Sequence, residues 1–532
     1  MRDMTIKTFV ERLLRGAAVG LATLLAGAAQ AAAPGITASS GGTSTFNLSA
    51  AAANISQPDG ASIYSWGYGC VSGSATHAPA AITGGACSTM QIPGPTLIVT
   101  QGQTVTVTLT NNLPAAAGNT SILFPGFNVT ATGGVDGLLT KEASVGGTVT
   151  YSFVANSPGT HAYYSGTQGD LQIEMGLYGA IIVLPSAVPA NCVATQNDSA
   201  RANGVEGDFR HATAAFNHAA TCYDREYLFQ FSEIDPKIHR AAQDIATCNA
   251  GPGITCPPNM NTVETEPYKP AYFMINGRSM PDDMDPNYAV QYPHQPYNGN
   301  PHMHPGELVL LRVIGQGRWQ HPFHEHGNHV RVLARDGNLI LSQTAASDPT
   351  QTKLAGPLLF TTTTTPGQAL DGIFQWTGKG LNWDVFGHRK AANGSDVDDP
   401  CVPDANGYYT SNPAAPNYYE WCGDHNKPLE DKPFGQVGSG GPVTLPDANI
   451  VANGPWYAGS PYLGGEATGR AVGSTPIPPS GTVANSPTDE AGFAYMWHSH
   501  NEREITTNNI FPGGMLMMML VDPRAFTIDE SK

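Results

Sequence analysis

The pattern of hydrophobic and polar positions predicts short β-strands along most of the chain. Residues 104–109 alternate Thr with Val and Leu, which is the period of a strand with one buried face. Helical periodicity of useful length is absent, apart from charged, helix-compatible patches at about 201–223. Further segments of strand composition follow at the spacing of β-sandwiches, at 96–99, 121–127, 148–153, 160–165, 177–184, 226–231, 272–276, 307–313, 329–333, 372–376 and 515–521.

The strand segments fall into two groups of similar kind, which predicts an all-β fold made of two tandem β-sandwiches. The first domain is expected at 45–186, after a stretch rich in Ala, Gly and Ser. A cysteine-bearing linker at 187–224 leads to the second domain at 225–524. Residues 391–486 are rich in Gly, Pro and Asn, so we expect a long loop insertion there rather than another core.

The composition supports this fold class and argues against some classes of binding partner. The chain has 532 residues, of which only 13% are charged, while 60 Gly and 42 Pro favour turns. A hydrophobic share of 41% argues against a disordered chain. The net charge of −17 argues against nucleic acid and anionic membranes as partners.

The first 31 residues have the features of a secretory signal peptide. Basic residues precede a small apolar run at 16–29, and Ala29-Gln30-Ala31 provides a small-residue cleavage site. The run is too short for a membrane anchor, and we expect no membrane span in the mature chain. Because no Arg-Arg pair precedes the run, Sec-type export to the periplasm or the extracellular space is the favoured route.

The eight cysteines are expected to form structural disulfides, because an even number occurs in a chain predicted to be exported. None has Cys-x-x-Cys spacing, which argues against a thiolate zinc site. Sequence alone leaves many pairings open. Our hypothesis is sequential pairing, which closes short loops: Cys70 with Cys87, Cys192 with Cys222, Cys248 with Cys256, and Cys401 with Cys422.

Two His-x-His pairs predict a metal site in the second domain. In a strand, residues i and i+2 point to the same face, so His324 lies beside His326, and His498 beside His500. If the two strands are neighbours, four imidazoles converge, which suits copper and, less well, zinc. A solvated face or satisfied core histidines are the alternative. His302-Met303-His304 could dock Cu(I), although an exposed loop is at least as good an interpretation.

Several short motifs follow one another along the chain. They are Pro93-Gly94-Pro95-Thr96, Asn111-Asn112-Leu113-Pro114, Gly176-Leu177-Tyr178-Gly179, Ile275-Asn276-Gly277, His321-Pro322-Phe323-His324-Glu325-His326-Gly327, and His498-Ser499-His500 followed by Gly514-Met515. In this order they resemble the motifs of multicopper oxidases, with the two-domain laccase subgroup as the best match. The resemblance implies tandem cupredoxin-like Greek-key β-sandwiches, with a type 1 copper that passes electrons to a trinuclear copper cluster. In two-domain members that cluster forms between subunits of a homotrimer.

The same resemblance shows where this chain departs from the family. All four cluster ligands expected in the first domain are replaced, by Leu123, Pro125, Tyr164 and Gly166. At the type 1 position, Ser499 aligns with the ligating cysteine and Glu504 with a histidine, while His321 and Met515 remain. A blue copper centre needs a thiolate, so the sequence argues against ordinary type 1 chemistry unless a distant cysteine reaches the site, and it argues against the usual laccase mechanism.

We therefore expect an exported copper-binding protein with one residual site of four histidines, which would hold one or two copper ions. It would act, if at all, as an oxidoreductase on a small-molecule or metal-ion substrate. Two alternatives stay open. One is a non-catalytic assembly or interaction protein that kept the cupredoxin fold, and the other is a copper-sequestering protein.

Overall fold

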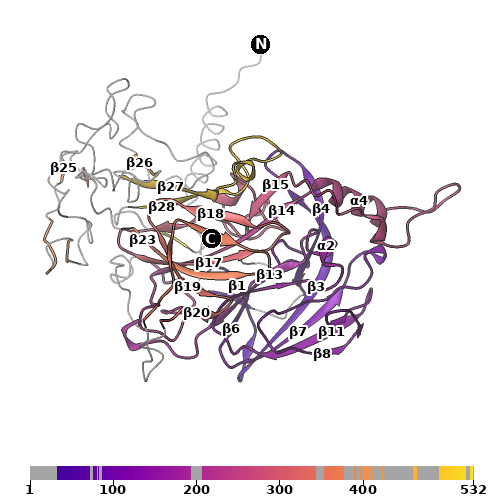
Figure 1. Cartoon of the computed structure of the whole chain (residues 1–532), viewed down its shortest axis with the longest axis horizontal. Helices are drawn as coiled ribbons and strands as arrows, with labels where there is room; N and C mark the ends of the chain where they lie inside the picture. Colours follow the sequence, from indigo (N-terminus) through magenta and orange to yellow (C-terminus); the bar gives the residue numbers. More distant parts are fainter. Residues whose placement is uncertain are drawn as a thin grey trace, which may run out of the picture.

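Two β-sandwiches make up the body of the molecule in the computed structural model (Figure 1). The predicted signal peptide and most of the predicted insertion at 391–486 lie outside the described residues. The structure describes residues 33–71, 76–80, 82, 85, 87–192, 206–342, 353–376, 389–390, 396–397, 401–405, 410–412, 422, 459–463, 491–522 and 528–530.

The first sandwich packs two sheets around a core that includes Phe46, Trp66 and Tyr151. One sheet joins, in order, β12 (Gly159–Tyr164), β13 (Tyr178–Leu184), β6 (Leu97–Thr100), β1 (Gly35–Thr37) and β5 (Thr76–Ala78). The other joins β2 (Ser39–Ser40), β3 (Thr43–Ser56), β7 (Thr104–Asn111), β11 (Thr148–Val154) and β8 (Thr130–Gly133), with β4 (Ser62–Cys70) paired to β3. A separate hairpin pairs β9 (Val135–Asp136) with β10 (Lys141–Glu142).

The second sandwich is built in the same way around Phe229, Phe323 and Trp497. One sheet joins β15 (Tyr272–Ile275), β14 (Arg225–Ile234), β17 (Leu308–Gly315), β23 (Ala369–Gln375), β19 (Val330–Arg335) and β20 (Asn338–Leu339), with β21 (Leu358–Leu359) on β19. The other joins β16 (His302–Met303), β28 (Leu516–Val521), β27 (Ala491–Ser499), β18 (His321–Glu325) and β22 (Thr361–Thr364), with β26 (Gly459–Leu463) on β27. A short pair joins β24 (Arg389–Lys390) to β25 (Asp396–Val397).

Strand patterning in the sequence matches the sheets where one face is buried. In β7, Val105, Val107 and Leu109 are buried and the threonines between them are not, as the alternation predicts. The sequence places the start of the first domain at about residue 45. Strands β1 and β2 and the first residues of β3 precede this position. The small residues of this segment, whose composition is of low complexity, form strands because sheet pairing uses main-chain hydrogen bonds.

Among the described residues helices are few, and the longest of them lies where no helix was predicted. Helix α4 (Pro236–Ala246) follows β14, and Asp235 caps it by accepting a hydrogen bond from the Lys237 amide. Ile238 and Ala242 pack against the core of the first sandwich, so a single short apolar face holds the helix. The predicted patches at 201–223 contain no helix in their described part. The remaining helical turns are α2 (Gly169–Gln172), η1 (Ala115–Ala117), η2 (Ala190–Cys192), η3 (Met260–Thr262), η4 (Asp282–Met284) and η7 (Glu502–Ile505).

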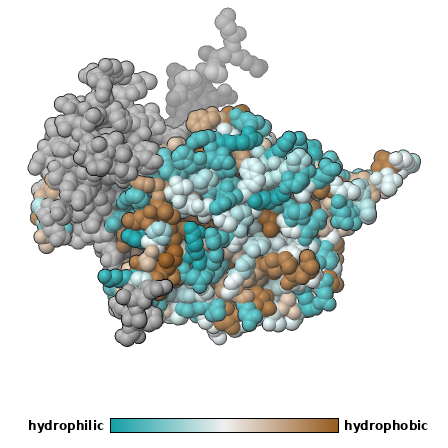
Figure 2. Space-filling view, viewed as in Figure 1, coloured by the Kyte–Doolittle hydropathy of each residue, from teal (hydrophilic) through white to brown (hydrophobic). Residues whose placement is uncertain are grey.

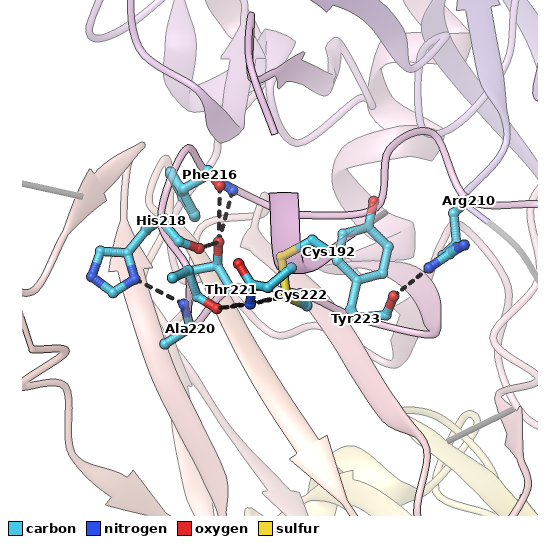
Figure 3. Close-up of a disulfide and its surroundings, with 10 residues drawn as sticks. Cys192, Arg210, Phe216, His218, Ala220, Thr221, Cys222 and Tyr223 are labelled. Carbon is cyan, nitrogen blue, oxygen red and sulfur yellow. Dashed lines mark hydrogen bonds between the residues drawn. A yellow bond between two sulfur atoms is a disulfide. The ribbon is translucent and has the colours of Figure 1, made fainter. Parts of the chain in front are cut away.

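All four sequential disulfides are confirmed. Figure 3 shows Cys192–Cys222, which ties the end of the first sandwich to the segment leading into β14. Beside it, the Thr221 hydroxyl donates to the carbonyl of Phe216, and Arg210 donates to the carbonyl of Tyr223 (2.7 Å). The cysteines therefore have the structural role that their loop positions predicted.

Buried charges join the two sandwiches. The Asp371 carboxylate of β23 accepts hydrogen bonds from the Thr160 amide (3.0 Å) and hydroxyl (2.6 Å) in β12. Arg312 of β17 contacts the same carboxylate at 3.3 Å and Glu226 of β14 at 2.8 Å. These side chains are at most 2% exposed, so each charge depends on its partners. An apolar cluster adjoins them, made of Ile98, Ala162, Ala180, Ile182, Leu228, Ile314 and Ala369.

The outer surface is mixed in character. Hydrophobic residues form small groups among hydrophilic ones on the face shown in Figure 2. Leu138 (93% exposed) and Leu139 (64%) form the tip of the β9–β10 hairpin. Among the described residues, no helix has the length and hydrophobicity needed to cross a membrane.

We predict that Asp371→Ala lowers the free energy of unfolding by about 3 kcal/mol, because Arg312 would lose a buried partner. Urea unfolding of the full chain measures the change. The control is Asp136→Ala, whose ion pair with Lys141 (2.6 Å) is exposed to solvent, so its loss should change the free energy of unfolding much less. Equal losses in the two variants would contradict a special contribution from the buried pair.

Candidate metal centre

Strands β18 and β27 bring the two His-x-His pairs together. They are antiparallel neighbours, with His324 opposite His498 and Phe323 opposite Ser499. Because side chains alternate along each strand, the histidines share one face, whereas Phe323 and Ser499 point to the other. The condition on which the predicted site depended, that the two strands are neighbours, is met.

The four imidazole rings form a compact group. His324, His326 and His498 are at most 5% exposed, whereas the His500 side chain is 50% exposed. The rings stand mostly edge to face, so their planes do not stack. Centroid distances are 4.8 Å for His324–His326, 5.6 Å for His324–His498, 4.6 Å for His324–His500, 5.1 Å for His326–His498 and 5.3 Å for His498–His500.

Hydrogen bonds at Nδ1 orient three of the rings. His498 Nδ1 donates to the carbonyl of Ser499 (2.7 Å), and His500 Nδ1 lies 3.2 Å from Glu502 Oε1. His324 Nδ1 lies 2.6 Å from the Thr361 hydroxyl on β22. A histidine that donates through Nδ1 presents its lone pair at Nε2, which is the usual arrangement of metal-bound imidazoles.

The pKa values of the cluster favour neutral imidazoles. Burial, together with the neighbouring His500 and His498, lowers the pKa of His324 to about 4. Burial also lowers the pKa of His498, and the nearby His500 adds to that effect. Neutral rings keep the lone pairs that a metal needs, so the chemistry of this donor set suits copper.

The positions of the nitrogens fit a metal only in part. His326 Nε2 and His498 Nε2 are 3.3 Å apart, close to the separation of about 3.3 Å between two nitrogens bound tetrahedrally at about 2.05 Å. Among the residues that the structure describes, no group of three or more His, Cys, Asp or Glu is arranged to hold an ion. The site therefore presents one well-placed pair, and His324 and His500 would have to turn toward it.

The type 1 position holds an ionic cluster of Glu233, His321, Ser499 and Glu504. His321 Nδ1 lies 2.8 Å from Glu504, and its Nε2 lies 2.9 Å from Glu233 of β14. The Ser499 hydroxyl donates to the same oxygen of Glu504. Burial lowers the pKa of His321, but hydrogen bonds and charge from both carboxylates outweigh it and raise the pKa to about 9. With a proton on each nitrogen, His321 has no lone pair for copper. Met515 is buried beside this region in the core.

The first-domain positions named by the resemblance contain no imidazole. Leu123 and Tyr164 pair through their main chains (2.7 Å and 3.3 Å), and a side chain at Gly166 would strike Leu123. Leu, Pro and Gly side chains have no donor atoms for a metal. His161 lies nearby in β12, where its Nε2 contacts the Ser157 carbonyl (2.9 Å) and its ring packs on Phe127.

His302 and His304 belong to a different buried network, and the expected exposed loop is wrong. His302 lies 2.6 Å from Asp522, and His304 lies 2.9 Å from Glu206. Arg225 pairs with Glu206 in the same network. Both histidines are fully buried among carboxylates, because the segment forms strand β16 against β28. The adjoining methionines of β28 are buried in the core.

Comparison with known proteins identifies the family to which the chain is related. Two models described as multicopper oxidase match the chain, at residues 81–188 and 264–370. The chain belongs to the multicopper oxidase family. The second match includes His321, His324 and His326, whereas His498 and His500 lie outside both matched ranges.

The individual relatives of this chain are distant, and it spans less than a fifth of the length of the curated relatives that it matches. An L-ascorbate oxidase of Brassica rapa subsp. pekinensis is 40% identical over 96 residues, covering 18% of this chain and 16% of the relative. Multicopper oxidase MCE of Talaromyces pinophilus is 32% identical over 120 residues, covering 22% and 19%. Among solved structures, the multicopper oxidase mgLAC has a TM-score of 0.44 at 14% identity, covering 91% of this chain and 88% of its own. A blue copper oxidase from Nitrosomonas europaea has a TM-score of 0.42 at 14% identity, covering 89% and 85%.

Three residues around the site were not found from the sequence. Glu233 reaches His321 from the opposite sheet, and Thr361 orients His324 from β22. Glu325 lies between His324 and His326 in the sequence and is fully buried. One of its carboxyl oxygens accepts a hydrogen bond from the Thr362 hydroxyl. Burial raises the pKa of Glu325 well above its usual range. The sequence contained no signal for Glu233 or Thr361, because their contacts arise only from the packing of strands.

We predict that the contribution of His321 to the free energy of unfolding falls by about 2 to 3 kcal/mol between pH 6.5 and 9.5. The folded pKa of His321 is about 9, against about 6.5 unfolded, so its contribution is complete below pH 6.5 and disappears as the pH rises through 9. Burial raises the pKa of Glu174 to about 8, which adds a further loss of stability up to pH 8. Urea unfolding across this range provides the measurement. His321→Gln should make the profile less steep and leave the part due to Glu174, and an unchanged slope in that variant would contradict the assignment.

Proposed function

We propose that this chain is an exported copper protein of the multicopper oxidase family that works without a type 1 copper. Its metal centre comprises His324, His326, His498 and His500, with room for one or two copper ions. The observation that carries the proposal is the orientation of the rings. The contact of His498 Nδ1 with the Ser499 carbonyl leaves His498 Nε2 as the ligand atom, and the hydrogen bond that joins it to His326 Nε2 (3.3 Å) holds the two nitrogens at the spacing of two metal ligands.

Copper bound by neutral imidazoles would supply one-electron redox chemistry at this site. The residues of the chain have separate roles around it. Thr361 and the Ser499 carbonyl fix the rings of His324 and His498. Burial of three of the histidines restricts water on the protein side, and the half-exposed His500 marks the side from which a small reductant would approach.

A non-catalytic role is the second candidate, and one observation favours it. No three potential ligands are arranged around a common point among the described residues. An assembly protein that kept the fold without its metals would be expected to show this. Retention of both His-x-His pairs, with their orienting contacts, argues for the copper site. Sequestration is less well supported, because His302 and His304 are committed to ion pairs.

We predict that the full chain, purified from a copper-supplied exporting host, retains at least one copper per chain with an EPR spectrum that lacks a blue-copper signal. His326→Ala/His498→Ala should lower the bound copper at least tenfold, because both well-placed nitrogens are lost. His77→Ala in the first sandwich is the control and should bind copper as the parent does.

The results separate the candidate functions. A parent protein without stoichiometric copper would refute the copper proposal and favour the assembly role. Bound copper with oxidation of phenols or metal ions supports an oxidoreductase. Bound copper without any such oxidation would contradict the redox role and leave sequestration as the function.

A further inference from the structure

The ionic cluster occupies the back of the same two strands that carry the four histidines. His321 is the first residue of β18, and Ser499 is the last residue of β27. Glu504 of η7 joins them, accepting hydrogen bonds from His321 Nδ1 (2.8 Å) and from the Ser499 hydroxyl. Its other oxygen accepts from the Asn501 amide group (2.8 Å). One carboxylate therefore connects both ligand-bearing strands and the turn that follows them.

Glu233 fixes this arrangement to the opposite sheet. Its carboxylate meets His321 Nε2 at 2.9 Å and accepts from the main-chain amides of Arg318 (2.6 Å) and Trp319 (2.8 Å). Tyr268 donates to it at 3.1 Å. Glu233, His321 and Glu504 are at most 2% exposed. Since each charge is buried and paired, displacing any member leaves another without its partner, and the cluster resists such movement.

A direct link runs from the ionic cluster to a metal ligand. The Ser499 side chain is held by Glu504, and the carbonyl of the same residue accepts the Nδ1 proton of His498. The position of this carbonyl decides which nitrogen of His498 carries the proton. It thereby leaves Nε2 directed at His326 Nε2, 3.3 Å away.

We propose that Glu233, His321, Ser499 and Glu504 are positioning residues that take over the structural role of a metal at the type 1 position. In place of copper, an imidazolium between two carboxylates joins β18, β27 and the opposite sheet. It holds the His498 ring in the tautomer that binds metal. Both nitrogens of His321 donate hydrogen bonds to carboxylates within the cluster. His321 therefore has no lone pair for copper, and the cluster excludes copper from this position. The effect on copper binding rests on the proposed function, whereas the effect on the His498 tautomer does not.

The first arm of the test uses metal-free full-length protein with 15N-labelled histidine. NMR at pH 7 should show both ring nitrogens of His321 protonated and His498 as a single Nδ1–H tautomer. Glu504→Gln and the milder Ser499→Ala should turn His498 into a mixture of tautomers, with circular dichroism unchanged. Asp136→Asn, at the exposed ion pair with Lys141 in the first sandwich, is the control and should leave both signals as they are. A His498 tautomer unaffected in both cluster variants would overturn the proposal.

The second arm measures copper binding. Glu504→Gln and Ser499→Ala should each weaken Cu(II) binding about tenfold and alter its EPR hyperfine pattern, as loss of an orienting partner does. Ser499→Cys alone should give no blue charge-transfer absorption, because Glu504 and Glu233 still hold His321. Blue absorption in that variant would overturn the exclusion of copper. A parent protein that binds no copper would refute the proposed function, while the NMR arm still decides the role of the cluster.

Discussion

The pairing of β18 with β27 is the interaction on which the rest of the site depends. Its register sets His324 against His498 and Phe323 against Ser499. Since strand side chains alternate, one register decides two things at once. It gathers imidazoles on one face, and it places Ser499 among the carboxylates on the other. A shift by one residue would exchange the faces, so the metal ligands and the ionic cluster can form only together.

Buried charge pairs stabilise the arrangement of strands in other parts of the molecule as well. Only 13% of residues are charged, yet many of these charges lie inside, in specific groups. Arg312 joins the two sandwiches, Arg225 holds the β16 region through Glu206 and Glu307, and His321 ties the ligand strands to β14. A buried charge is stable only beside its opposite charge or hydrogen-bonding partner, whereas apolar side chains can pack in several ways. Such groups therefore favour one arrangement of the strands more strongly than apolar packing does.

The sequence predicted features that follow from local pattern. Alternation in β7, the short-loop disulfides and the shared face of His324 and His326 are all visible in neighbouring residues. Helix α4 was missed because its apolar face is short and its contacts lie on the other sandwich. Glu233 was missed because 88 residues separate it from His321. Glu504 was noticed only as a substitution, and its hydrogen bonds show what the substitution does.

Two histidines three residues apart show how the fold separates metal binding from ion pairing. His324 has a pKa lowered to about 4 and His321 a pKa raised to about 9, although both lie on β18. Burial lowers both values, so the difference comes from the neighbours. His324 faces other imidazoles, which disfavour its charge, whereas His321 faces two carboxylates, which favour it. At neutral pH one face of the strand therefore offers lone pairs and the other offers protons. Only the first face has the lone pairs that copper binding requires, so both the proposed copper site and the ionic cluster depend on the same strand.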